Sequence, residues 1–321
     1  MSSPPSPTVS FKLTSRLFAF FLSLALSLLA LEVGLRALDL RPLEIKKKKL
    51  VPIRPILHHK DPPLFTMRPS ISTNQVYFRC RSGTCSPDMR IPFRTNKMGW
   101  RDEEVSRSKP DGTFRILVLG DSFTAGDGVQ QEQTYPEVLE DLLNERYQGT
   151  ARFEAINTAV QGTGTYDQWH VLQEQGLQFS PDMVLVGMYL NDTQTVGVQH
   201  LGAPGANNVL PNVHYPQSLY LAKWIRSFRY SRNSYRDSID MYQALWDSEQ
   251  NTQGLSEWST AMSYFGALQQ DRNLPVLIAL FPWLNMLDDS YPFGDIHERI
   301  GLTAQSSGME IIDLLPVFSS L

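Results

Sequence analysis

Ser122 is the residue of this chain whose type and setting could do chemistry. The apolar run Ile116–Leu119 has strand character, and Gly120-Asp121-Ser122 follows it directly, ahead of a small turn that ends at Gly128. A hydroxyl at the carboxyl end of a strand lies where open α/β sheets bind ligands. A serine there can be a nucleophile if neighbouring groups activate it. The same tripeptide also suits an ordinary turn, so other segments have to decide between the two interpretations.

Two further strand ends run into polar loops. The strand that ends at Asn157 is followed by a loop with Gly162 and Gly164, and the apolar run 183–189 is followed by Leu190-Asn191-Asp192. Such loops suit a ligand site on a doubly wound sheet. Asn191-Asp192 would equally suit a helix cap or an Asx-turn, and both glycines would suit plain turns.

The ordered set Gly-Asp-Ser, Asn-x4-Gly and Gly-x3-Asn-Asp resembles the SGNH (GDSL-like) hydrolase superfamily. The resemblance covers roughly residues 96–321 and includes the lead-in Thr95–Asp102. It implies that Ser122 attacks an ester carbonyl. It also implies an oxyanion hole formed by the backbone N–H of Ser122, the backbone N–H of Gly162 and the side-chain amide of Asn191. Preorganised donors of this kind stabilise the tetrahedral intermediate, and losing one typically costs about 3–4 kcal/mol of barrier.

The resemblance also implies a base, from an Asp-x-x-His block after the last strand. Asp167-x-x-His170 has that spacing, but we expect it on the helix after the Gly162 loop, as a pair on the helix surface. Asp295-x-His297 has the wrong spacing and opens a predicted helix that runs to about Ser307. The other four histidines lie in loop-like sequence without a suitably spaced acid: His58, His59, His200 and His214.

The predicted last strand falls within residues 309–321, where the printed sequence ends. We therefore expect the base to be missing from this polypeptide, as in a fragment, a frameshifted product or an inactive relative. A base reassigned to His297 or His170 stays open, because catalytic triads are recognised by geometry and not by chain order.

Composition excludes several classes of function. The net charge of −4 gives no reason to expect nucleic-acid binding. The histidines and the two cysteines show no metal-binding spacing, so we expect no metal and no cofactor. A phosphate-binding loop at Gly120–Gly128 is disfavoured, because no lysine follows it as in a P-loop and no Gly-x-Gly-x-x-Gly is present.

Residues 17–38 predict an N-terminal transmembrane signal anchor. The segment approaches the about 20 apolar residues that span a bilayer, and Lys12 and Arg16 precede it. No Ala-x-Ala cleavage site follows, although a cleaved signal peptide and a buried helix remain alternatives. Basic residues flank both ends, and the positive-inside rule alone would place the domain in the cytoplasm. We nevertheless expect the extracytoplasmic side, as for relatives with such an anchor.

The two cysteines, Cys80 and Cys85, favour the same side. Their close spacing predicts a small disulfide loop, which fits an oxidising compartment, although two free thiols remain an alternative.

Strands that alternate with helices predict a three-layer α/β/α fold. Together with the resemblance, this implies a parallel, flavodoxin-like five-stranded sheet of the SGNH hydrolase type plus the N-terminal transmembrane helix. The predicted organisation is a tail (1–16), the anchor (17–38), a linker (39–75), an N-terminal extension with short strands (76–113) and the hydrolase-like domain (114–321). Helices are expected at about 132–147, 166–178, 219–227, 234–246 and 256–270, and a loop or cap over the site at 193–217.

The expected function is a serine esterase or acylhydrolase of SGNH type, acting on a small ester or an acylated glycan. The alternatives are a cell-surface polysaccharide O-acetyltransferase and a catalytically inactive binding domain. Tyr215, Tyr220 and Trp224 could line an acyl or sugar pocket, or simply belong to the core. The sequence does not indicate the oligomeric state.

Overall fold

The computed structural model describes residues 8–38, 56–58, 64–81, 84–194 and 220–321. The chain divides into two compact units, and each is described here by itself. The first unit comprises Met1–Lys47, Arg79–Ser86 and Asn208–Tyr235, and the second comprises Lys48–Phe78, Pro87–Asn207 and Arg236–Leu321.

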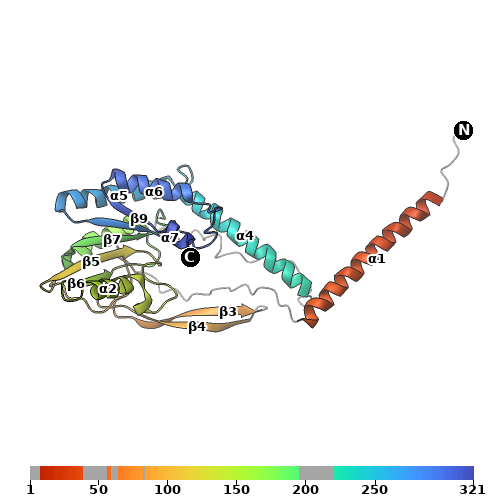
Figure 1. Ribbon diagram of the computed structural model, residues 1–321, viewed down its shortest axis with the longest axis horizontal. Helices are drawn as coiled ribbons and strands as arrows, with labels where there is room; N and C mark the ends of the chain where they lie inside the picture. Colours follow the sequence, from red (N-terminus) through yellow and green to blue (C-terminus); the bar gives the residue numbers. More distant parts are fainter. Residues whose placement is uncertain (1–7, 39–55, 59–63, 82–83, 195–219) are drawn as a thin grey trace. The chain divides into compact units, whose positions relative to one another are not determined.

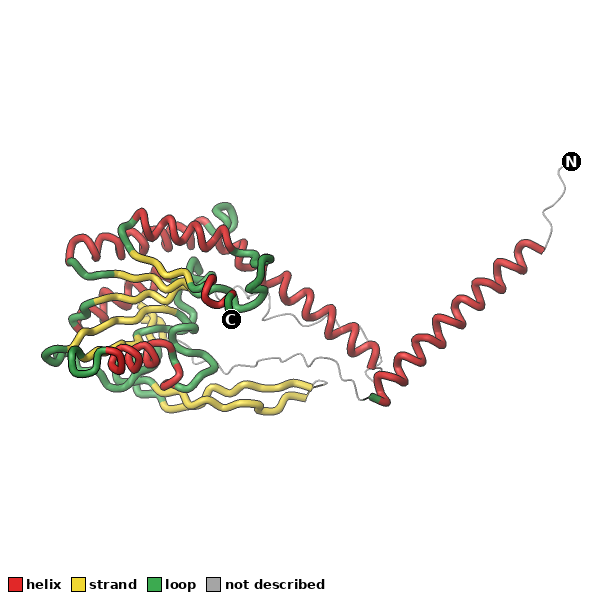
Figure 2. The backbone as a smooth tube through the Cα atoms, viewed as in Figure 1, coloured by secondary structure: helices red, strands yellow, loops and turns green. Residues whose placement is uncertain are grey.

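The second unit is built on a parallel sheet of five strands (Figure 2). The strands are β5 (Thr113–Gly120), β6 (Arg152–Asn157), β7 (Met183–Met188), β8 (Val276–Leu280) and β9 (Glu310–Asp313). Their spatial order is β6-β5-β7-β8-β9. The first of the five along the chain, β5, therefore lies between the second, β6, and the third, β7. This is the flavodoxin-like order, in which the switch point lies beside the first strand. The predicted sheet is confirmed.

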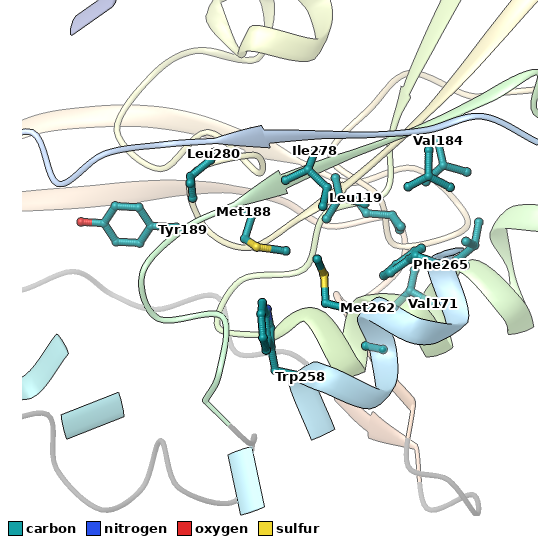
Figure 3. Close-up of a cluster of buried hydrophobic side chains, with 14 of the residues drawn as sticks. Leu119, Val171, Val184, Met188, Tyr189, Trp258, Met262, Phe265, Ile278 and Leu280 are labelled. Atoms are coloured by element: carbon teal, nitrogen blue, oxygen red, sulfur yellow. The ribbon is translucent and has the colours of Figure 1, made fainter. Parts of the chain in front are cut away.

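One face of the sheet carries the main hydrophobic core. Alternate strand residues such as Leu119, Val186 and Ile278 point to this face, as the two-residue period of a strand requires. Side chains of α3 (Thr165–Glu174) and α5 (Thr252–Arg272) pack on them, and Figure 3 shows this cluster. Helix α6 (Gly294–Ser306) joins the same core through buried side chains such as Ile300.

The other face carries a smaller cluster. Ile116, Val118 and Leu185 point to it, and α2 (Tyr135–Arg146) packs there with Leu139 and Leu143. In Figure 1, α2 lies on one side of the sheet and α5 and α6 lie on the opposite side. The predicted three-layer α/β/α architecture is therefore confirmed.

The remaining elements are short, apart from one hairpin. Strands β3 and β4 form a two-stranded sheet of their own and are longer than the short strands expected in the N-terminal extension. The bounds are β1 (Ile56–His58), β2 (Leu64–Thr66), β3 (Ser72–Arg81), β4 (Thr84–Arg94), η1 (Gln131–Gln133), η2 (Gly176–Phe179) and α7 (Leu315–Ser319).

The first unit contains α1 (Thr8–Ala37) and the beginning of α4 (Tyr220–Trp246). Within α1, Arg16–Ala37 is long and apolar enough to cross a membrane, with a mean hydropathy of 2.2, although a signal sequence has the same properties. Helix α4 is continuous, so the prediction of two separate helices at 219–227 and 234–246 was wrong. Neither glycine nor proline occurs between Tyr220 and Trp246, and the weak helix formers Ser and Asn do not interrupt a helix by themselves.

Candidate active site

Ser122 lies in a tight turn directly after β5. Phe123 N–H donates to the carboxylate of Asp121 (2.9 Å), and Asp127 N–H donates to the carbonyl of Ser122 (3.0 Å). A Cβ on Gly120 would lie 2.0 Å from Thr124 Oγ1, so only glycine allows the turn to close this tightly. Ser122 itself is partly exposed at the carboxyl edge of the sheet.

The loop after β6 is bonded to this turn. Val160 N–H donates to the carbonyl of Gly120 (3.1 Å), and the side-chain amide of Asn157 donates to the carbonyl of Thr124 (3.0 Å). The Gln161 amide donates to the Asp127 carboxylate. Gly162 comes next with φ of +78°, a conformation that favours glycine. The structure thus brings the Gly162 loop against the Ser122 turn.

The loop after β7 carries Asn191 and lies on the other side of β5. The Asn191 amide lies near the Asp121 carboxyl and lowers its pKa, against the larger effect of burial. Thr165 N–H donates to the Asp192 carbonyl (3.0 Å), which joins this loop to the start of α3. A Cβ on Gly164 would lie 2.6 Å from that carbonyl oxygen, so the contact between the two loops requires glycine.

Two buried carboxyls lie beneath the loops. Burial raises the pKa of Asp121 to about 6, and it raises the pKa of Asp192 well above its ordinary value. The charge of Asp121 also raises the pKa of Asp192, whereas Thr165 Oγ1 (3.0 Å) and Gln168 Nε2 (3.3 Å) donate to Asp192. These interactions give Asp192 a structural role beside Asn191, because it holds the β7 loop to α3.

Arg101 is a site residue that the sequence did not single out. Its guanidinium is fully buried and donates to the carbonyls of Ala125, Gly126 and Val129, the last at 2.7 Å. The guanidinium carbon also lies 4.7 Å from the centre of the Phe93 ring. One side chain therefore fixes the turn that follows Ser122. The signal in the sequence was the charged pair Arg101-Asp102 at the end of the lead-in segment.

Asp102 holds the end of the neighbouring strand, β6, by a hydrogen bond. Its carboxylate accepts the N–H groups of Asn157 and Glu103, both at 2.7 Å. Burial raises the pKa of Asp102 to about 8, although both hydrogen bonds favour the ionised form. The lead-in segment thus holds the end of β6 as well as the serine turn.

His297 is paired with an acid that the sequence did not suggest. Its Nδ1 lies 2.9 Å from Oδ1 of Asp313, the last residue of β9, and its Nε2 lies 3.0 Å from the Tyr291 hydroxyl. Burial raises the pKa of Asp313, but the hydrogen bonds from His297 and from Leu315 N–H outweigh it, so the net shift is downward. Asp295, the acid nearest in sequence, is exposed. The pairing depends on the chain returning through β9, and short-range spacing cannot reveal it.

Asp167 and His170 are both on α3, as predicted, but the expectation of a pair on the helix surface was wrong. Asp167 is buried and accepts the Gly164 N–H (3.0 Å), so it caps the first turn of α3. His170 packs edge-on against Tyr166, and burial lowers its pKa. Among the residues that the structure describes, no hydrogen bond joins Ser122 to either histidine.

Several other predicted features lie outside the described part of the chain. These are most of the 193–217 cap with Tyr215, the linker residues 39–55, and the side chains of His58, His59, His200, His214, Cys80 and Cys85. Within the described residues, no group of three His, Cys, Asp or Glu side chains could hold a metal ion.

Aromatic rings line the neighbourhood of Ser122. Phe123 stacks on Tyr189 at 4.1 Å between ring centres, and Phe281 lies 6.0 Å from Phe123. Phe123 and Phe281 are both partly exposed. They provide an apolar surface from β5 and from the loop after β8 that the sequence had not indicated.

The sheet order, with polar loops at the carboxyl ends of β6, β5 and β7, is that of a flavodoxin-like α/β domain with its candidate site at this edge. Residues 116–226, which contain Ser122, Gly162 and Asn191, match the model of the GDSL-like lipase/acylhydrolase family. No curated protein sequence matches the chain.

Solved structures are also similar in outline. AlinE4, an esterase of the SGNH-hydrolase family, is 17% identical with a TM-score of 0.36, and the match covers 64% of this chain and 77% of that one. A catalytic mutant of Axe2, an acetylxylan esterase from Geobacillus stearothermophilus, is 14% identical with a TM-score of 0.39, covering 64% and 78%. TesA is 12% identical with a TM-score of 0.36, covering 61% and 76%. At such values these likenesses say nothing about substrate.

Proposed function

We propose that the second unit is a serine esterase in which Ser122 attacks the carbonyl carbon of a carboxylic ester. The oxyanion would be held by the backbone N–H groups of Ser122 and Gly162 and by the side-chain amide of Asn191. The observation that supports this most is the set of contacts between the three loops, above all Val160 N–H to the Gly120 carbonyl. Donors fixed before the reaction stabilise the developing charge without reorganisation.

The proposed step forms a bond between Ser122 Oγ and the carbonyl carbon, and the carbonyl π electrons move to the oxygen. The hydroxyl proton passes to a base, and the carbonyl re-forms as the ester C–O bond breaks and the alcohol leaves with a proton. Water then attacks the acyl-serine, which releases the acid and returns the hydroxyl to Ser122. Tyr291 and Asp313 occupy both ring nitrogens of His297. We therefore infer that this polypeptide turns over slowly, at a rate supplied by the oxyanion donors and by substrate binding. A site that lacks one member of a catalytic triad retains about 10³–10⁴-fold over water through such groups.

The partly exposed rings of Phe123 and Phe281 support a small acyl group as substrate. An apolar wall beside the nucleophile would hold the methyl group of an acetyl ester, as apolar pockets with a few polar groups commonly do. An acetylated glycan or a small acetyl ester fits this proposal equally well.

Hydrolysis of p-nitrophenyl acetate by the purified full-length chain tests the proposal. Ser122→Ala should reduce the rate to the background, and Asn191→Ala should reduce kcat by about 10²–10³-fold. The matched control is Ser259→Ala, because Ser259 is exposed on α5 and should leave the rate unchanged. An unchanged rate in the Ser122→Ala variant would disprove the role of Ser122.

We also propose that α1 is retained as a membrane anchor and that the hydrolase domain lies in the oxidising compartment outside the cytoplasm. The apolar span Arg16–Ala37 supports the anchor, and the close spacing of Cys80 and Cys85 supports an oxidising compartment. In that compartment we predict a Cys80–Cys85 disulfide. Mass spectrometry of membrane-extracted protein under non-reducing conditions should find both cysteines resistant to alkylation, and labelling of both thiols without reduction would refute the disulfide.

A further inference from the structure

Glu32 is the one buried residue in the span Arg16–Ala37, and it belongs to the first unit. Its Oε1 accepts the backbone N–H of Tyr220 (2.9 Å), and its Oε2 accepts the backbone N–H of Leu221 (2.8 Å). These two N–H groups lie in the first turn of α4, where helix donors have no partner within the helix. Glu32 therefore caps α4 from another helix.

Arg36 completes this contact. It donates to Glu32 Oε1 at 2.7 Å, and its guanidinium carbon lies 5.7 Å from the centre of the Tyr220 ring. The carboxylate thus has three donors, one from its own helix and two from α4. A carboxylate in an apolar helix is costly unless it is paired, so these contacts remove a cost that exposure to lipid would impose.

The position of Glu32 also sets the depth at which α4 begins. Glu32 lies five positions before Ala37, where α1 ends. At 1.5 Å per residue, the start of α4 would lie about 8 Å from the end of α1. That distance is comparable with the polar headgroup layer on one side of a bilayer. Figure 1 shows the C-terminal end of α1 and the start of α4 meeting, as these hydrogen bonds require.

The first half of α4 has the composition of a helix that lies on a membrane surface. Between Tyr220 and Arg236 the sequence has five basic residues and no acidic residue: Lys223, Arg226, Arg229, Arg232 and Arg236. Leu221, Trp224 and Ile225 follow helical spacing, and Ile225 is 47% exposed. Basic residues beside an apolar stripe are typical of interfacial helices that bind anionic lipid.

We propose that the first half of α4 docks on the anionic lipid surface beside the point where α1 leaves the bilayer, with Glu32 fixing its start. The partner is the layer of phosphate-bearing headgroups, which the basic residues match in charge. Retention of α1 is necessary, because a cleaved α1 would remove the cap. The chemistry at Ser122 is not involved.

Hydrogen exchange measured by mass spectrometry tests the docking. The full-length chain is placed in nanodiscs of phosphatidylcholine alone or mixed with phosphatidylglycerol. Amides of residues 222–234 should exchange at least about fivefold more slowly with the anionic lipid, because several basic residues contribute to the attraction. Equal exchange in the two lipids would overturn the proposal.

Two sets of variants test whether the basic residues of α4 cause the slower exchange with anionic lipid. Changing Lys223, Arg226, Arg229 and Arg232 together to Gln should abolish the difference between the lipids. The matched control changes four exposed basic residues of the second unit to Gln and should keep the difference: Lys97, Arg146, Arg152 and Arg272. A difference that survives in the first variant would show that α4 is not the lipid-binding surface.

The cap has its own test in the same samples. Glu32→Leu should speed exchange at the Tyr220 and Leu221 amides by about tenfold or more in both lipids, because their acceptor is lost. Leu29→Ala, at an exposed position of α1, should leave these amides unchanged. Unchanged exchange in Glu32→Leu would refute the cap, and release of the wild-type chain from membranes by carbonate would refute the retained anchor.

Discussion

At the scale of single residues, the structure assigns the shape of the serine turn to side chains outside it. Arg101 donates to three carbonyls of the turn, and Asp102 holds the end of the neighbouring strand. Arg101 is buried and Asp102 is half-buried, so the Arg101 interactions are made in a low-dielectric setting where an unpaired group is costly. The geometry around Ser122 thus depends on the segment that precedes the sheet.

Arg101→Ala should destabilise the domain strongly. The change removes a donor from three carbonyls, and a buried group that is left unpaired costs about 1–3 kcal/mol. Arg101→Lys should lie between the wild type and Arg101→Ala, because an ammonium cannot reproduce the planar fork of donors. Urea denaturation of detergent-solubilised protein measures both variants. The exposed Arg146→Ala should change the free energy of unfolding by less than about 0.5 kcal/mol, and an equally small effect in Arg101→Ala would contradict the assigned role.

His297→Ala should lower stability but leave the Ser122-dependent rate per folded molecule unchanged. The variant removes the hydrogen bonds of His297 to Tyr291 and Asp313. These bonds join the loop after β8 and helix α6 to the end of β9. Thermal unfolding and p-nitrophenyl acetate hydrolysis, measured on the same preparation, separate the two effects. A folded variant without Ser122-dependent turnover would instead identify His297 as the base.

At the scale of elements, the site depends on how closely β5 and β7 approach α2. A Cβ on Gly187 of β7 would lie 2.3 Å from the Tyr135 hydroxyl and 2.4 Å from Thr124 Oγ1. These two hydroxyls are themselves hydrogen-bonded at 3.0 Å. Gly187 therefore provides the space in which α2 and the serine turn meet over the sheet.

Gly187→Ala should destabilise the domain by about 1–3 kcal/mol, the usual cost of overpacking a tight site. The matched control is Gly301→Ala on α6, where an added Cβ meets nothing within 4 Å. This control should stabilise the helix by up to about 1 kcal/mol, since alanine is the better helix former. Chemical denaturation compares the two variants, and a neutral Gly187→Ala would contradict the close approach.

Local patterns predicted the strands and their order along the chain, because an apolar run followed by a polar turn is visible within ten residues. The loops of Ser122, Gly162 and Asn191 were predicted for the same reason, together with the family resemblance. Contacts between distant segments were not predictable from spacing. Arg101 contacts carbonyls more than 20 residues away, Asp313 pairs with a histidine on the preceding helix, and Glu32 caps a helix 188 residues later.

At the scale of the whole molecule, buried carboxyls determine how stability varies with pH. Burial raises the pKa of Asp102 to about 8, of Asp167 to about 7 and of Asp121 to about 6. Between the ordinary carboxyl range near 4 and these values, the folded chain holds protons that the unfolded chain releases. The free energy of unfolding from these groups is therefore greatest below about pH 4 and is lost as the pH rises to 8.

Asp102→Asn should flatten this decline, because asparagine cannot ionise. Denaturation with urea at a series of pH values from 4 to 9 should show a shallower fall for the variant than for the wild type, mostly between pH 4 and 8. The exposed Asp141→Asn is the control and should keep the wild-type slope. An unchanged slope in Asp102→Asn would show that Asp102 is not the buried, proton-holding group described here.

The central claim is that Ser122, Gly162 and Asn191 surround one small oxyanion. A crystal structure of the chain after prolonged incubation with a small phosphonylating ester tests it most directly, because the phosphonyl oxygen occupies the place of the oxyanion. We expect an adduct on Ser122 Oγ, with that oxygen within about 3 Å of the Ser122 N–H nitrogen, the Gly162 N–H nitrogen and the Asn191 side-chain nitrogen. An adduct on another residue, or an oxygen that points away from Gly162 and Asn191, would contradict it.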